Sequence, residues 1–275
     1  MNVRLKFFGG ARTVTGSRYL LEVDNFKILV DCGLFQGIKE LRLKNWENFP
    51  VNVEEIDAVL ITHAHIDHTG YLPRLVREGY GGPIYCTKPT EDLMQIMLMD
   101  SAKLQEEEAA FARKKGYSKH ENPQPLYNSR DVDQVLPMIK SFDFNELIQV
   151  SDHIKIKFHN AGHILGAAVI EVLLNGSNQD KRLLFSGDLG RNEDVLLYPP
   201  SEFHHADILL IESTYGNRDN PQGDHLSELA KVINQALDRG GCLLIPAFAV
   251  GRTQTILYYL KLLSESGRIP DVPIY

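Results

Sequence analysis

The sequence is poor in cysteine, in long apolar runs and in positive charge, and each shortage excludes a class of protein. Its three cysteines are far apart and include no CxxC pair, which predicts free thiols in a reducing compartment rather than a disulfide framework. No run reaches about 18 apolar residues, so no membrane span is expected. Residues 1–16 lack the apolar core and cleavage pattern of a signal peptide. Together these features predict a cytoplasmic location.

The net charge of −7 argues against a protein whose whole surface attracts nucleic acid. A polyanion would have to be attracted locally, by bound metal and a few Arg or Lys side chains. The sequence does have enough apolar material for a core, because hydrophobic residues make up 43% of its 275 residues. This length and composition predict one large domain or two modest ones.

Strand-like and helix-like segments alternate along the chain, which predicts an α/β protein. Three predicted strands are mostly apolar, as buried strands are: Phe26 to Asp31, Ile56 to Thr62 and Asp207 to Glu212. The spacing of Leu, Met and Ala predicts a long amphipathic helix from Thr90 to Lys115. A second helix is expected from Ser129 to Ser141, and a hairpin turn around Gly176 to Asn178.

The composition changes after residue 214, where a polar, turn-rich stretch begins. The segments beyond it are predicted to be a helix, a strand and a helix: Leu226 to Arg239, Gly241 to Pro246 and Arg252 to Ser264. Because this part has its own alternation of helix and strand, we place a domain boundary near residue 214.

The hexad His63-Ala-His65-Ile-Asp67-His68 is the densest group of metal-ligand side chains in the chain. By the chain's own His and Asp frequencies, chance would produce it in on the order of one such sequence in a thousand. His63 and His65 are two apart on an extended segment, so they face the same way and suit one ion. Asp67 and His68 follow once the chain has begun to turn, and suit a second ion. One loop therefore offers both halves of a two-metal centre.

Two further donors follow predicted strands at long range. His163 comes directly after Asn160-Ala161-Gly162, and Asp188 comes after Phe185-Ser186-Gly187. Each alone would be an ordinary turn residue. With the hexad they make six donors, which is about the number that a pair of zinc ions needs.

The order Asp31, HxHxDH, His163 and Asp188 resembles the metallo-β-lactamase fold signature. The segments 211–216 (IESTYG) and 246–252 (PAFAVGR) resemble the β-CASP branch of that fold, which contains RNA-processing nucleases. The resemblance implies a four-layer αββα sandwich that carries two zinc ions, with a second α/β domain inserted late in the chain. Residues 1–214 would be the metallo-β-lactamase domain, and residues 215–275 the first part of the inserted β-CASP domain.

The resemblance also implies a role for each of these side chains. The zinc ligands would be divided between two ions that share one carboxylate: His63, His65 and His163 for the first, Asp67 and His68 for the second, and Asp188 for both. Asp31 would accept a hydrogen bond from a ligand histidine and fix its ring. Asp67 would also orient the attacking water or accept its proton. Glu212 matches the acidic motif of the branch, which supports a general-acid histidine.

Substrate contacts are expected beyond the boundary, at Ser213, Thr214 and Arg252. Gly251-Arg252-Thr253 opens a predicted helix, where backbone N–H groups and the helix dipole favour a phosphate. Each of these roles has a structural alternative: Asp31 as a turn cap, Glu212 without a functional role, and Arg252 as a solvated residue at a helix start.

The β-CASP branch has two further histidine motifs downstream of any counterpart of Arg252, and the sequence stops before them. The resemblance therefore implies a weakened second zinc site and impaired turnover for these 275 residues. His225 is a rival for the last ligand, because simple members of the superfamily have a ligand histidine at a similar distance from the bridging aspartate.

The function implied by the resemblance is a zinc-dependent phosphodiester hydrolase. We expect a ribonuclease of RNA processing or decay that acts on single-stranded RNA, with a water activated by two metal ions as nucleophile. No membrane partner is expected, and a homodimer is left open. The alternatives are a small-molecule hydrolase of the superfamily and a non-catalytic scaffold subunit.

Overall fold

The computed structural model describes residues 1–116, 122–176, 180–219 and 223–275. The described chain forms two compact units. The first comprises Met1–Asn192 and Tyr198–Glu212, and the second comprises Glu193–Leu197 and Ser213–Tyr275. The assignment of these units to the two expected domains stays a prediction.

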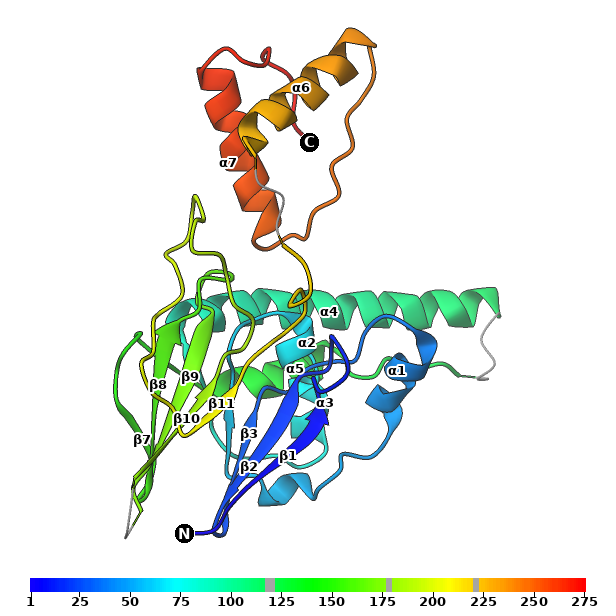
Figure 1. Cartoon of the computed structure of the whole chain (residues 1–275). Helices are drawn as coiled ribbons and strands as arrows, with labels where there is room; N and C mark the ends of the chain where they lie inside the picture. The colour runs from blue at the N-terminus through cyan, green and yellow to red at the C-terminus, as the bar shows by residue number, and fades with distance from the viewer. Residues whose placement is uncertain (117–121, 177–179, 220–222) are drawn as a thin grey trace. The chain divides into compact units, whose positions relative to one another are not determined.

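The first unit contains a six-stranded sheet whose strands follow chain order (Figure 1). Its strands are β1 (Val3–Gly9), β2 (Arg18–Val23), β3 (Phe26–Val30), β4 (Ala58–Leu60), β5 (Ile84–Thr87) and β6 (Ile139–Phe142). Strands β1 to β3 pair antiparallel, and β3 to β6 pair parallel. Two of the three predicted buried strands form β3 and β4 of the parallel part, and the apolar residues of both strands are mostly buried. The third, Asp207 to Glu212, lies in the second sheet, and its prediction as a buried strand is wrong, because Leu209 is 54% exposed.

A second sheet of five strands has the order β11-β10-β9-β8-β7. Its strands are β7 (Ile148–Ser151), β8 (Ile154–Asn160), β9 (Ala168–Leu174), β10 (Lys181–Phe185) and β11 (Ile208–Leu210). Strands β7 to β10 are antiparallel, and β11 runs parallel to β10. The hairpin turn predicted at Gly176 to Asn178 includes residues 177 and 178, which lie outside the described residues.

The two sheets share one core, so they pack face to face. Leu21 and Ile28 of the first sheet, and Phe158 and Ile170 of the second, are all fully buried in it. Burying each such side chain stabilises the fold by about 1.5–3 kcal/mol. The predicted mixed α/β class with two sheets and helices is therefore confirmed.

Helices pack against the first sheet and against one another. The α-helices of the first unit are α1 (Lys39–Leu43), α2 (Ile66–Thr69), α3 (Leu72–Arg77), α4 (Lys88–Lys115) and α5 (Ser129–Val135), with 3₁₀ turns at Lys44–Trp46, Val53–Glu55 and Leu136–Met138. Helix α4 contacts β5, β6, α2 and α5. Its first turn is capped by Thr87, whose hydroxyl accepts the Thr90 N–H at 3.3 Å, and it ends at Gly116 with a φ of 64°.

The prediction of a single helix from Ser129 to Ser141 is wrong. Helix α5 stops at Val135, and Ile139–Phe142 forms β6 at the edge of the first sheet. Pro137 has no N–H to continue the helix ladder. Beyond it, Ile139 pairs with Ile84 and Phe142 with Thr87, so the pairing with β5 decides the conformation.

The second unit is a pair of helices, α6 (His225–Asp238) and α7 (Arg252–Glu265). They pack through a small apolar cluster that includes Ala230, Ile233, Leu260 and Leu263. The strand predicted from Gly241 to Pro246 is not formed. Its apolar side chains find no strand to pair with among the described residues of this unit, and Leu244 is 89% exposed.

None of the described helices is both long enough and apolar enough to cross a membrane.

Candidate metal centre

The predicted ligands of the first unit gather where strands of both sheets end. Asp31 follows β3, and the hexad begins three residues after β4 and continues into α2. His163 lies in the turn after β8, and Asp188 follows β10. The parallel neighbours β3 and β4 end at one edge of the first sheet, and β8 and β10, which both run antiparallel to β9, end at one edge of the second. Residues far apart in sequence therefore come together.

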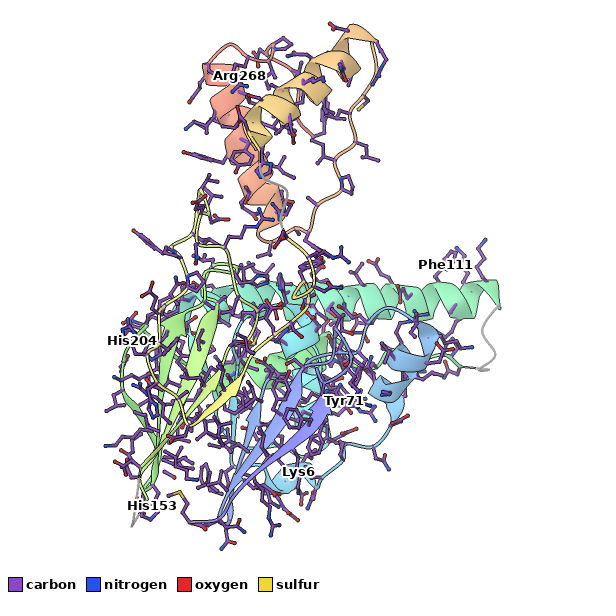
Figure 2. The ribbon with its side chains drawn as sticks, viewed as in Figure 1. Lys6, Tyr71, Phe111, His153, His204 and Arg268 are labelled. Atoms are coloured by element: carbon purple, nitrogen blue, oxygen red, sulfur yellow. The ribbon has the colours of Figure 1, made fainter. Side chains whose placement is uncertain are left out.

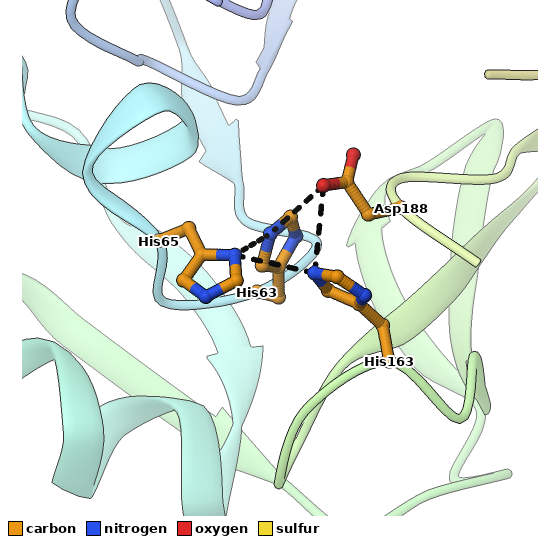
Figure 3. Close-up of side chains that lie close together, drawn as sticks. All are labelled: His63, His65, His163 and Asp188. Carbon is orange, nitrogen blue, oxygen red and sulfur yellow. Dashed lines mark hydrogen bonds and ion pairs between the residues drawn. The ribbon is translucent and has the colours of Figure 1, made fainter. Parts of the chain in front are cut away.

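Four of these side chains point toward one another: His63, His65, His163 and Asp188 (Figure 3). Each offers one ligand atom, and these atoms all lie within 4.8 Å of one another. His65 Nδ1 lies 3.0 Å from His63 Nε2 and 3.2 Å from His163 Nε2. Asp188 Oδ2 lies 3.7 Å from His63 Nε2 and 3.5 Å from His163 Nε2. Such a convergence of imidazole nitrogens and a carboxylate suits a cation.

His68 and Asp67 lie on the other side of Asp188. His68 Nε2 is 3.2 Å from Asp188 Oδ1 and 3.8 Å from Asp67 Oδ2. The two oxygens of Asp188 thus face two different groups: Oδ2 faces His63 and His163, and Oδ1 faces His68. Each oxygen of Asp188 therefore faces a separate group of donors.

Asp31 is buried beneath the hexad and accepts hydrogen bonds from several donors. The Thr62 N–H donates to Oδ1 at 2.8 Å, and the His68 Nδ1–H donates to Oδ2 at 2.7 Å. The Ser17 hydroxyl lies 3.3 Å from Oδ2. His68 therefore holds a proton on Nδ1, and its Nε2 faces Asp188 Oδ1. Burial lowers the pKa of His68, but the Asp31 and Asp188 carboxylates outweigh it, and the pKa is raised.

The three histidines of the first group have lowered pKa values. Burial is the largest cause for each, and the neighbouring imidazoles add to it. The pKa of His65 falls from 6.5 to about 4, while His63 is lowered well below 6.5. Neutral imidazoles are the form that binds metal. Several lone pairs converging with a carboxylate repel one another unless a cation or a shared proton lies between them, so the donor set fits a metal ion.

The carboxylates of the site differ from each other. Burial is the largest influence on Asp188 and would raise its pKa, but the hydrogen bond and charge of His68 reverse this, and the pKa is lowered. The pKa of Asp67 is raised, chiefly by burial. Without a cation in the site, Asp188 therefore keeps its negative charge more readily than Asp67 does.

Two glycines allow the loops of the site to touch. A Cβ on Gly33 would lie 1.6 Å from the Asp67 carbonyl oxygen, and a Cβ on Gly190 would lie 1.6 Å from the Gly162 carbonyl oxygen. Gly33 thus admits the turn that carries Asp67, and Gly190 admits the turn that carries His163. The sequence pattern did not single out either residue, because the signal is a close approach of backbones.

Glu212 lies in the first unit at the end of β11. Its Oε1 accepts the N–H of Leu189, the residue after Asp188, at 3.1 Å. Its own N–H donates to the Ser186 hydroxyl at 3.0 Å. Glu212 therefore ties β11 to the loop that carries Asp188, and its role toward a general-acid histidine stays a prediction.

The predicted substrate contacts belong to the second unit. Ser213 and Thr214 are its first residues after β11, and Arg252 is the first residue of α7. The N–H of Gly251 donates to Gln254 Oε1 at 2.7 Å, so this helix start is partly satisfied internally. The rival ligand His225 is the first residue of α6 in the same unit.

Two other histidines, His153 and His204, are exposed on the first unit (Figure 2). Neither is among the predicted site residues. They lie in different segments from the six gathered donors, which makes them suitable as control positions.

The fold and this site define the class of the protein. Residues 20–198 match the metallo-beta-lactamase superfamily domain, and the chain belongs to this superfamily. It is 38% identical over 274 residues to Ribonuclease TTHA0252 of Thermus thermophilus, covering 99% of this chain and 58% of that protein. It is 35% identical over 277 residues to Transcription termination factor FttA of Methanocaldococcus jannaschii, covering 99% of this chain and 41% of that protein.

These relatives confirm the predicted resemblance to the β-CASP RNA-processing branch. The chain spans between about two fifths and three fifths of their length.

Proposed function

We propose that this protein is a metal-dependent phosphodiester hydrolase that cleaves single-stranded RNA. The observation that carries the proposal is that the two oxygens of Asp188 face different groups of donors. One group is His63, His65 and His163, and the other is His68 with Asp67. The relatives named as a ribonuclease and as transcription termination factors support RNA as the substrate class.

The proposed cofactor is a pair of zinc ions. Imidazole and carboxylate donors in groups of three suit zinc and its neighbours among the first-row metals. His63, His65 and His163 would hold one ion, His68 and Asp67 the other, and Asp188 both. When bound, the two cations supply positive charge for the scissile phosphate and make a water acidic enough to act as nucleophile at neutral pH.

The chain's own side chains have distinct tasks in this proposal. Asp67 would orient the attacking water and accept its proton. Asp31 holds the His68 ring through the 2.7 Å hydrogen bond. Glu212 keeps the Asp188 loop in place and, as proposed from the motif, supports a general-acid histidine.

The proposed substrate contacts are Ser213, Thr214 and Arg252. Local cations and Arg252 would attract the RNA backbone, since the chain as a whole has a net charge of −7. We place the protein in the cytoplasm as part of the proposal, because its three cysteines are free thiols. A homodimer, and impaired turnover by these 275 residues alone, stay predictions.

The proposal is tested in the full-length protein by cleavage of a 5′-labelled single-stranded RNA, with zinc content measured in the same samples. Asp67→Asn should abolish cleavage because it removes the proton acceptor, and His65→Ala should also lower the zinc content. His153→Ala and His204→Ala are matched controls at exposed positions and should change neither. Cleavage retained by Asp67→Asn at unchanged zinc content would contradict the proposal.

The same preparations discriminate the two alternatives. A small-molecule hydrolase would turn over a lactam or a thioester while leaving the RNA intact. A scaffold subunit would bind RNA without cleaving it, whatever its zinc content.

A further inference from the structure

Thr62 lies directly before the hexad and is not among the predicted site residues. It is 1% exposed, and its hydroxyl sits among the site's polar groups. Its Oγ1 lies 3.0 Å from Asp31 Oδ1, 2.9 Å from Asp31 Oδ2 and 3.0 Å from His63 Nδ1. His68 Nδ1 is farther away, at 3.4 Å. The hydroxyl therefore stands between a carboxylate and a histidine of the first group.

A count of protons assigns the direction of each hydrogen bond. A threonine hydroxyl has one proton to donate, and a carboxylate only accepts. The His68 proton goes to Asp31, since that distance of 2.7 Å is much the shorter of its two. The Thr62 proton must also go to Asp31. The Thr62 Oγ1 lies 3.0 Å from Asp31 Oδ1 and 2.9 Å from Asp31 Oδ2, and without a proton between them only lone pairs would face each other. His63 Nδ1 is then left as the donor to Thr62.

This assignment fixes the ring of His63. With its proton on Nδ1, the His63 lone pair lies on Nε2, the atom that faces His65 and Asp188. Asp31 receives the proton of His68 directly and is linked to His63 through Thr62. One buried carboxylate thus orients a histidine on each side of Asp188.

The rest of Thr62 is also held tightly. Its carbonyl accepts the Ala168 N–H at 2.8 Å, which joins the hexad loop to the second sheet. A Cβ on Gly187, the residue before Asp188, would lie 2.7 Å from the Thr62 Cβ. A side chain of a different shape would therefore disturb the Asp188 loop, so an informative substitution must keep the shape of threonine.

We propose that Thr62 is a positioning residue whose hydroxyl sets the Nδ1–H tautomer of His63 and couples the two halves of the metal centre through Asp31. This inference rests on the proposed metal centre. The position of the His63 proton is a property of the metal-free protein, so it can be tested separately from zinc binding and RNA cleavage.

The decisive substitution is Thr62→Val, which keeps the branched shape and removes the hydroxyl. Thr62→Ser restores a hydroxyl and should rescue the effect. Thr69→Val is the matched control, because Thr69 is also fully buried but its hydroxyl donates only to the backbone carbonyls of Ala64 and His65.

The first readout is the tautomer of His63 in the metal-free protein, measured from its ¹⁵N shifts and assigned with His63→Gln. Wild type, Thr62→Ser and Thr69→Val should show Nδ1–H, and Thr62→Val should populate Nε2–H because the acceptor is gone. The second readout is zinc affinity by competition with a chromophoric chelator. Thr62→Val should weaken it about 10- to 100-fold, as loss of a group that orients a ligand does.

The outcomes separate the explanations. An Nε2–H tautomer in wild type, or an unchanged tautomer in Thr62→Val, overturns the inference. A loss of stability in Thr62→Val with unchanged tautomer and zinc affinity would show a structural role only, and also overturns it. If wild type has the predicted tautomer but neither binds zinc nor cleaves RNA, the proposed function fails while the assignment of the His63 proton stands.

Discussion

Replacing Gly33 by alanine should damage the metal centre without replacing any ligand side chain. The added Cβ would lie 1.6 Å from the Asp67 carbonyl oxygen and 2.1 Å from its carbon, where real Cβ contacts essentially never fall below 3.0 Å. The neighbouring backbone must therefore move by about 1.4 Å, the difference between 3.0 and 1.6 Å. The obstacle is backbone, which cannot rotate away as a flexible side chain can.

The size of the effect follows from what this movement breaks. The Cys32 N–H donates to the His68 carbonyl at 2.7 Å, and the Leu34 N–H to the Ile66 carbonyl at 3.0 Å. Losing both costs about 1–3 kcal/mol, and overpacking adds about 1–3 kcal/mol. A displacement of this order at Asp67 and His68 should lower the cleavage rate about 100-fold.

The matched control is Gly81→Ala, because a Cβ on Gly81 meets nothing within 4 Å and its backbone needs no left-handed conformation. Urea unfolding and zinc titration of both variants provide the assay. Gly33→Ala should lose stability and bind the second zinc more weakly, while Gly81→Ala should match wild type. Equal behaviour of the two variants would refute the argument that close backbone packing at residue 33 holds the site.

Three further outcomes are expected. Asp31→Asn should weaken zinc binding about 10- to 100-fold, because an amide cannot accept from His68 and Thr62 as a carboxylate does; a chelator competition assay with unchanged affinity would contradict this. The pKa of His65 is about 4 in the folded metal-free protein against 6.5 ordinarily, so the unfolded chain binds this proton more readily. Its contribution to the free energy of unfolding should therefore be lost as the pH falls from about 6.5 to about 4, and urea unfolding of His65→Gln should show a flatter dependence there. Ile233→Ala should destabilise the second unit by about 2–5 kcal/mol and leave the zinc affinity unchanged, which differential scanning calorimetry with zinc titration checks.

The six donors that the sequence singles out lie close together in the structure, although some elements around them differ from prediction. The hexad is local, so its spacing alone predicts which of its donors would share an ion. The contact between His163 and His65 spans 98 residues. The position of His163 after a predicted strand made it a candidate donor, and the resemblance to a known family was needed to assign it to an ion. The role of Asp188 between two groups likewise becomes visible only from the distances of its two oxygens.

The features that could not be predicted depend on contacts with residues far away in the sequence. Ile139–Phe142 has no strong period of its own, and pairing with β5 makes it a strand. Gly241 to Pro246 has the composition of a strand but pairs with none in the described part of its unit. Thr62 could have been noticed from its place directly before His63, yet the direction of its hydrogen bonds requires the position of Asp31.

Anomalous diffraction at the zinc absorption edge, from crystals of the full-length protein grown with zinc, tests the central claim most directly. The account predicts two peaks about 3.5–4 Å apart. One should lie among His63, His65 and His163, the other beside His68 and Asp67, with Asp188 contacting both. A single peak with no contact to Asp188, or no peak among these residues, would contradict the account.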